Sequence, residues 1–260
     1  RQPASAGLIL PGVEFIRRPK QTVIKMTDSD PTSPSLTVTE RMQRLIDLWQ
    51  ARNDKRAAFL ACYQLMTANM LDAINNGEFN DAEWVYSLLH HFAEYYFRAL
   101  ESYEQGDLAT PSTWRQTFEA ANQPGTLTLQ NLLLGINAHI NYDLTFTLVD
   151  MLEPEWWELS SEERQGRYDD HCQVNAVIQR TIDSVQDNIL EPGAPLLQLA
   201  DRLLGSADEW FVSRLISHWR ETVWHNAQRM LEACDADEKQ QVRLEIEREA
   251  LERARLILHV

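Results

Sequence analysis

The residues best suited to chemistry are His139 and Asp143, which stand four positions apart in the segment 132–152. This segment has the composition of a buried helix, yet it carries two Asn, one His and two Asp. Residues four apart on a helix project from the same face, so the pair could offer a metal ion one nitrogen and one oxygen. A divalent ion with open positions activates water or polarises an ester or phosphoester. We therefore expect Asp143 and His139 to be metal ligands and catalytic residues.

A buried hydrogen-bond network is the alternative interpretation of the same segment. On a helical wheel of about 100° per residue, its polar side chains form two opposite stripes. One stripe contains Asn137, Asn141 and Thr145, and the other contains His139, Asp143, Thr147 and Asp150. At most one stripe can face solvent, so the other must be buried with hydrogen-bond partners. A buried His–Asp pair without any metal would meet this requirement.

Two further predicted helices each contribute an inward histidine. His91 falls in the apolar stripe of 84–99, and His171 falls with Asn175 in the apolar stripe of 168–185. Helical bundles build metal sites from inward side chains on facing helices. We therefore expect His91 and His171 to join His139 and Asp143 around one zinc or iron ion.

Four residues are candidates for substrate binding. Asn137 and Asn141 could orient a substrate, or support the metal ligands, if their stripe lies beside the pocket. Tyr95 and Tyr142 belong to a complement of eight Trp, seven Tyr and eight Phe that could line a cavity for an apolar ligand. These residues predict a pocket without identifying what fills it.

The helices that would position these side chains are predicted from periodicity and capping signals. Capping-box sequences begin at Thr37, Asn80, Ser160 and Ser206, Thr110-Pro111 offers a cap followed by Pro, and Gly77 and Gly106 are expected to end helices. The expected helices are 39–54, 56–75, 81–104, 111–122, 128–152, 161–190, 195–204, 207–234 and 237–258. The last one is rich in Glu and Arg and should close the bundle with one solvated face.

The sequence predicts an all-α fold. With no internal repeat, these elements predict a single-domain bundle of about eight or nine helices over 37–260. Residues 1–36 hold five of the ten Pro and a polar stretch, so we expect an irregular N-terminal arm there.

Composition excludes several functional classes. A net charge of −15 disfavours binding to nucleic acid and to anionic membranes, and no apolar run is long enough to span a bilayer. Three widely separated Cys without a Cys-x-x-Cys motif indicate neither a disulfide framework nor a thiolate zinc site, so we expect a cytoplasmic protein. Glycine-rich phosphate loops, Gly-x-Ser-x-Gly and His-Glu-x-x-His are absent from the sequence. The expected partner is a small-molecule ligand or substrate.

Three stretches resemble a known family. They are "FAEYYFRALESYEQG" (92–106), "TWRQTFEAA" (113–121) and "LLLGINAHINYDLTFTL" (132–148). They are similar to a family of bacterial proteins known as domain of unknown function 5995, over roughly residues 40–230. The most specific element is "NAHINYD" at 137–143. The resemblance implies a single helical domain and brings no assigned chemistry.

A weaker similarity, at the level of the fold alone, is to the all-helical zinc-dependent phospholipase C and single-strand nuclease group. That resemblance implies that His139 and Asp143 match a metal-binding pair, and that His91 or His171 matches an isolated ligand. Those enzymes are secreted and use an N-terminal Trp as a ligand, whereas this chain begins with Arg1.

Two functions are compatible with these patterns. The first is a metal-dependent enzyme that acts on a small or apolar substrate, for example by ester or phosphoester hydrolysis, with its site inside a helical bundle. The second is a non-catalytic helical module for ligand binding or interaction, in which the buried His, Asp and Asn form only a hydrogen-bond network.

Overall fold

The computed structural model describes residues 36–187 and 208–259, and every regular element in these ranges is a helix. In chain order the elements are α1 (Val38–Ala51), α2 (Arg56–Asn75), α3 (Ala82–Glu104), α4 (Ser112–Ala121), α5 (Thr128–Ile136), the π-helix η1 (Asn137–Leu144), α6 (Thr145–Leu152), α7 (Ser161–Asp187), α9 (Asp208–Leu231) and α10 (Ala236–His259). Because α5, η1 and α6 follow one another without a break, the described residues form eight continuous helices. The all-α prediction is confirmed. The expected helix 195–204 lies outside the described residues, as does the expected arm apart from its last residue.

The helix starts follow local capping signals. The predicted capping boxes form at Thr37 and Ser160. Each cap side chain accepts a hydrogen bond from the backbone N–H of the Glu three residues later, and the carboxylate of that Glu accepts one from the backbone N–H of the cap. The signal expected at Asn80 is displaced by one residue. The carboxylate of Asp81 is the group that accepts a backbone N–H of the first turn of α3, at 2.9 Å. Ser206 lies outside the described residues.

The helix ends at Gly77 and Gly106 are also as predicted. Both residues have positive φ, +73° and +71°, a conformation that glycine adopts without steric cost. The start of α4 differs from the expectation, because Pro111 is the N-cap itself and Thr110 turns its hydroxyl to the backbone oxygen of Asp107 at 2.8 Å.

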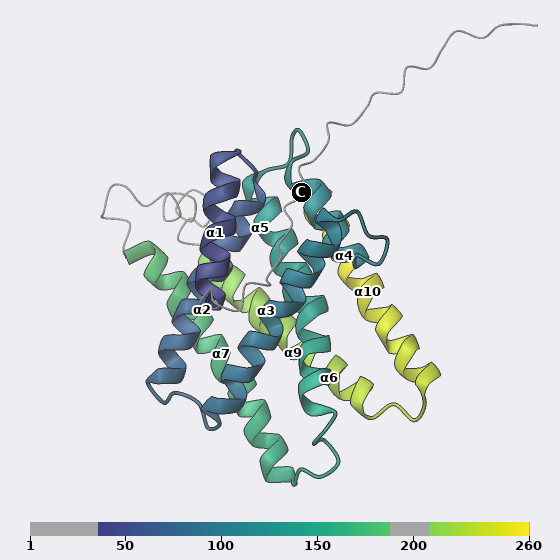
Figure 1. Ribbon diagram of the computed structural model, residues 1–260. Helices are drawn as coiled ribbons and strands as arrows, with labels where there is room; N and C mark the ends of the chain where they lie inside the picture. The colour runs from purple at the N-terminus through teal and green to yellow at the C-terminus, as the bar shows by residue number, and fades with distance from the viewer. Residues whose placement is uncertain (1–35, 188–207, 260) are drawn as a thin grey trace, which may run out of the picture.

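The continuous helix α5–η1–α6 lies in the middle of the bundle and packs against α2, α3, α4, α9 and α10 (Figure 1). Both of its polar stripes are buried except at Asp150. The residues with at most 3% exposure are Asn137, His139, Asn141, Asp143, Thr145 and Thr147. This helix therefore has no solvent face along its middle, and all of these polar groups need partners inside the protein.

The π-helix η1 interrupts the α-helical spacing of this central helix. A π-helix closes its hydrogen bonds over five residues rather than four, and such segments occur frequently at functional sites. A helical wheel drawn with one constant angle per residue therefore puts the side chains that follow η1 on the wrong face. Asp150, which the wheel puts in line with His139 and Asp143, is an example, since its side chain is 48% exposed.

The outer helices close the bundle around this centre. α1 packs on α2, and α7 packs on both α2 and α9. The last helix, α10, lies along α4, α5, η1 and α9 and buries Val242, Ile246, Ala250 and Ala254, as expected for an amphipathic closing helix (Figure 1). No helix in the described ranges is long and apolar enough to cross a membrane.

Gly135 sets how closely α5 approaches α2. A Cβ placed on Gly135 would lie 2.3 Å from Cγ and 2.9 Å from Cβ of Phe59. These atoms sit near the backbone of α2, so the ring cannot move aside without shifting the helix. Phe59 lies against His139, so this contact also determines the surroundings of the central histidine.

We expect Gly135→Ala to lower the free energy of unfolding by about 1–3 kcal/mol, the usual cost of overpacking, despite the higher helix propensity of Ala. Gly166→Ala in α7 is the matched control, because a Cβ there meets no atom within 4 Å. The control should stabilise the protein by about 0.5–1 kcal/mol. Urea unfolding of both variants checks this, and equal effects would contradict it.

Candidate functional site

The predicted pair of His139 and Asp143 forms inside the protein. His139 Nδ1 lies 3.0 Å from Asp143 Oδ2, and the two side chains are 4% and 1% exposed. Asp143 Oδ2 also accepts a hydrogen bond from Nε1 of Trp114, on α4, at 2.8 Å. The carboxyl group of η1 thus joins the central helix to α4.

Aromatic rings hold the His139 imidazole in place. The ring of Phe92, on α3, stacks on it at a centroid distance of 3.6 Å and an interplanar angle of 8°. Tyr63, on α2, meets it edge-on at 4.3 Å. Phe59, Tyr96 and Trp114 complete the surroundings at 6.0–6.1 Å. Such packing leaves the imidazole little freedom to rotate.

Burial shifts the ionisation of both members of the pair toward their neutral forms. It lowers the pKa of His139 well below its usual value. It also raises the pKa of Asp143 well above its usual value, against the opposing effect of the hydrogen bond from Trp114. A neutral imidazole that donates Nδ1–H to Asp143 keeps a lone pair on Nε2. This arrangement differs from a buried ion pair.

His91 does not face the interior, contrary to the sequence prediction. Its side chain is 33% exposed, and its Nε2 lies 3.0 Å from Oδ2 of Asp150. Tyr95, one of the expected substrate-binding residues, donates its hydroxyl to the same carboxylate oxygen at 2.7 Å. These three residues form a partly exposed cluster between α3 and the end of α6.

His171 is buried as predicted, but it belongs to a different cluster. Its Nε2 lies 3.0 Å from the backbone oxygen of Arg220, whose Nη2 donates to the backbone oxygen of His171 at 2.6 Å. Arg220 Nε also donates to Oδ1 of Asn175 at 2.9 Å. Burial, and next the charge of Arg220, keep the pKa of His171 well below its usual value. His171 and Asn175 therefore join α7 to α9.

The remaining expected substrate-binding residues are buried in the packing around η1. Asn137 Nδ2 donates to the backbone oxygen of Ala250 on α10 at 2.8 Å, and Asn141 Nδ2 donates to Asn137 Oδ1 at 3.0 Å. Tyr142 packs edge-on against Phe146 at a centroid distance of 4.7 Å. Of these contacts, the one from Asn137 reaches another helix, and none of the three residues lines the apolar cavity described below.

The structure does not gather the four expected metal ligands. His139 and Asp143 bond to each other, while His91 and His171 bond to Asp150 and Arg220. Within the described ranges, no group of three or more His, Cys, Asp or Glu could hold a metal ion. The described residues therefore do not fit a zinc or iron centre, which needs at least three protein ligands in the usual catalytic sites.

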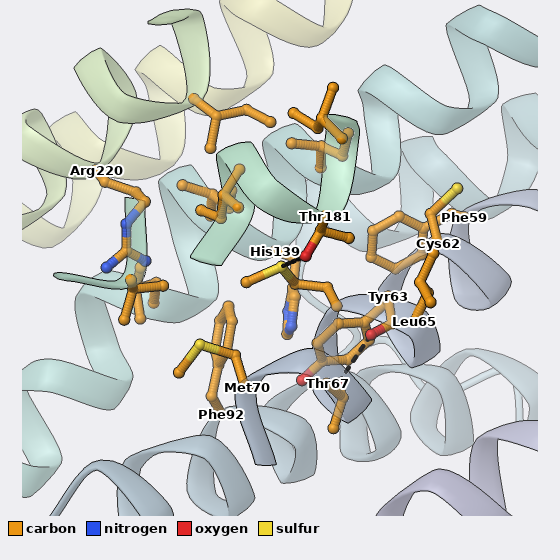
Figure 2. Close-up of a pocket in the computed structure, with 18 of the residues that line it drawn as sticks. Phe59, Cys62, Tyr63, Leu65, Thr67, Met70, Phe92, His139, Thr181 and Arg220 are labelled. Atoms are coloured by element: carbon orange, nitrogen blue, oxygen red, sulfur yellow. Dashed lines mark hydrogen bonds between the residues drawn. The ribbon is translucent and has the colours of Figure 1, made fainter. Parts of the chain in front are cut away.

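An apolar cavity of about 220 Å³ lies beside His139 (Figure 2). Helices α2, α3, α5, α7 and α9 and the π-helix η1 contribute its walls, mainly with Leu, Ile, Val, Met and Phe side chains. The polar exceptions are Thr67, Thr181, His139, Arg220 and the hydroxyl of Tyr63. Of the site residues predicted from the sequence, His139 alone lines this cavity.

Two polar atoms at this cavity stand out because each is buried without a hydrogen bond to the rest of the described chain. They are Nε2 of His139 and Oη of Tyr63. Burial, and next the charge of Asp143, raise the pKa of Tyr63 well above its usual value, so its hydroxyl stays protonated. With Nδ1–H donated to Asp143, the Nε2 of His139 can accept a hydrogen bond, and the Tyr63 hydroxyl can donate one.

Sequence reasoning missed three residues of this site. Tyr63 and Trp114 carried no motif, although a buried Trp or Tyr usually requires a partner for its polar atom. Arg220 did carry a signal. It stands four residues after Ile216 and three before Val223, so a charged residue interrupts the apolar stripe of α9.

Fold and site together define an all-α protein built on a buried polar helix with an apolar cavity at its flank. The chain belongs to the family of unknown function DUF5995, whose family model matches residues 36–260. This match confirms the resemblance seen in the sequence. No curated protein and no solved structure matches the chain.

Two substitutions of Asp143 test whether its role is to accept hydrogen bonds or to carry a negative charge. Asp143→Asn keeps an acceptor for the Trp114 indole and the His139 imidazole, whereas Asp143→Leu leaves the indole N–H buried and unpaired. We expect the Leu variant to be less stable than the Asn variant by about 1–3 kcal/mol, the cost of an unsatisfied buried donor. Chemical unfolding of both variants measures the difference. An Asn variant as unstable as the Leu variant would show that the negative charge is what matters.

Proposed function

We propose that this protein is a non-catalytic binding protein that holds a small, mainly apolar ligand in the cavity beside His139. The observation that carries the proposal is the cavity itself, about 220 Å³ enclosed largely by aliphatic and aromatic side chains. An engineered apolar cavity of about 150 Å³ in another protein stays dry and binds benzene. A cavity of this size is therefore suited to a substituted ring or a medium-length alkyl chain.

The walls of the cavity are well ordered by packing. His139 is held between Phe92 and Tyr63, and Gly135 brings α5 directly onto Phe59. A preformed site loses little conformational freedom when a ligand enters, which favours affinity. A rigid, preformed cavity favours a binding function over a catalytic site that forms only when the substrate is present.

Polar contacts would orient the ligand. The unpaired Nε2 of His139 and Oη of Tyr63 belong to residues that line the cavity, and a ligand could supply the hydrogen bonds that they lack. Ligand sites usually combine apolar walls with a few such groups, which give specificity. A ligand with a polar group on an apolar body fits this pattern.

The metal-dependent hydrolase stays a prediction with less support. His139 and Asp143 supply two ligand atoms, and their mutual hydrogen bond already uses Nδ1 and Oδ2. The described residues around them are aromatic rather than acidic, so a divalent cation would meet little negative charge.

Cavity filling tests the binding proposal. The wild-type protein should bind the uncharged fluorescent probe N-phenyl-1-naphthylamine with saturation near one equivalent. Ile140→Trp, at a half-buried position that lines the cavity, should weaken this binding at least tenfold, because the indole occupies the ligand's space. Leu244→Trp is the control, since Leu244 is 55% exposed on α10. It should leave the affinity unchanged. Probe binding that ignores Ile140→Trp would contradict the proposal.

Metal removal tests the rival function. If the protein works without a metal, dialysis against EDTA should leave its melting temperature unchanged, and elemental analysis of protein purified without added metal should find far less than one equivalent of zinc, iron or manganese. A fall in melting temperature that added metal reverses would favour the hydrolase, because bound metal stabilises the folded state.

A further inference from the structure

Arg220 is a buried cation without an acidic partner in the described chain. The residue is 5% exposed, and none of the salt bridges between described residues includes it. The adjacent Glu221 does not compensate for it, because that carboxylate bonds to the hydroxyl of Tyr168 and to His225. Buried charges are normally paired, so the isolated guanidinium needs an explanation.

The hydrogen bonds of Arg220 use only neutral acceptors. Nε donates to Asn175 Oδ1, and Nη2 donates to the backbone oxygen of His171 and approaches His171 Nδ1 at 3.3 Å. No hydrogen bond joins Nη1 to the part of the chain that the structure describes. The guanidinium is therefore fixed in position with one nitrogen unused and its charge uncompensated.

Burial lowers the pKa of Arg220 to about 10, which still leaves it protonated at neutral pH. The charge is thus present in the folded protein, in a chain whose net charge is −15. Arg220 lines the cavity, and Figure 2 shows it on the side away from Tyr63 and Phe59, with apolar side chains around the space between. No Lys or other Arg lines this cavity among the described residues.

We propose that Arg220 is the anion-binding group of the cavity and that the ligand is a monocarboxylic acid with an apolar tail. This inference rests on the proposed binding function and names its ligand class. The carboxylate would pair with the guanidinium, for which Nη1 supplies a charge-assisted hydrogen bond. The tail would extend between α2, α3 and η1 toward His139.

The single charge of the site favours a carboxylate over a phosphate. A carboxylate carries one negative charge, which Arg220 balances. A phosphate monoester carries about 1.5 to 2 negative charges at pH 7 and three acceptor oxygens, so it would keep an unbalanced charge in an apolar environment. A purely apolar ligand would leave the guanidinium as unpaired as before.

The competing explanation is that Arg220 serves only to join α9 to α7 through His171 and Asn175. Both explanations expect a substitution of Arg220 to change stability. They differ in ligand selectivity, because a purely structural arginine would not make the cavity prefer an anion over a neutral molecule with the same tail.

Displacement of N-phenyl-1-naphthylamine from the full chain at pH 7 tests the proposal. The competitors are octanoate, 1-octanol, octylamine and octyl phosphate, which share one tail. Octanoate should displace the probe at a concentration at least tenfold lower than octanol, with octylamine and octyl phosphate weaker than octanoate. In Arg220→Met the preference of octanoate over octanol should fall to about one, while octanol itself binds nearly as before.

Arg243→Met is the matched control. It removes the same charge from an exposed position on α10, where the guanidinium lies over Phe146, and should keep the full preference for octanoate. If Arg220→Met does not fold, Arg220→Lys replaces it. Lysine keeps the charge but lacks the planar donor set, so octanoate affinity should fall severalfold with octanol unchanged.

The outcomes separate this inference from the proposed function. Probe and octanol binding without any preference for octanoate, or a preference that survives in Arg220→Met or is unaltered in Arg220→Lys, overturns the role of Arg220 and leaves the binding function intact. Stronger binding of octyl phosphate overturns the carboxylate assignment. Failure of the probe and all four competitors to bind overturns the binding function and this inference together.

Discussion

The structure depends on one constraint: the middle of the central helix is buried on every side and carries polar side chains, most of which form hydrogen bonds within the protein. Asn137 reaches a backbone oxygen of α10, and Asp143 accepts the indole N–H of α4. An unpaired buried polar group costs more than an average hydrogen bond gains, so these contacts restrict where the neighbouring helices can lie. The polar residues of the central helix thereby specify its packing in a way that apolar residues alone would not.

The cavity follows from the same arrangement. His139 bonds to Asp143 through Nδ1, lines the cavity, and has Phe92 stacked on its face. The aromatic rings that hold the imidazole also form one end of the cavity wall. A second polar cluster, around Arg220, contributes the opposite side from α7 and α9. The molecule therefore has two buried polar clusters, around His139 and Arg220, separated by the apolar walls of the cavity.

The sequence was sufficient for the helices and for the His139–Asp143 pair, because both depend on local spacing and on capping residues such as Thr37 and Gly106. It was insufficient for the hydrogen-bond partners that these side chains meet on other helices. Which helix meets Asp143 depends on how distant segments pack, so Trp114 could not be assigned to it. The prediction that His91 faces inward was wrong, because positions at the border of an apolar stripe are only half-buried. At this position Asp150 is available as a partner. Arg220 interrupts the apolar stripe of α9, but the stripe alone does not show that its guanidinium is buried.

The π-helix has an implication for how this sequence can change. Its wider turn accommodates residues that an α-helix of the same length would not, so it sets the rotational phase between α5 and α6. α5 packs toward α2 and α4, whereas α6 packs toward α3 and α9. A π-helix takes more residues per turn than an α-helix, so loss of a single residue within 137–144 would allow ordinary α-helical spacing and would leave α6 close to its present rotation relative to α5. The cost of such a loss would fall on the side chains of 137–144 themselves, which include the buried pair His139 and Asp143.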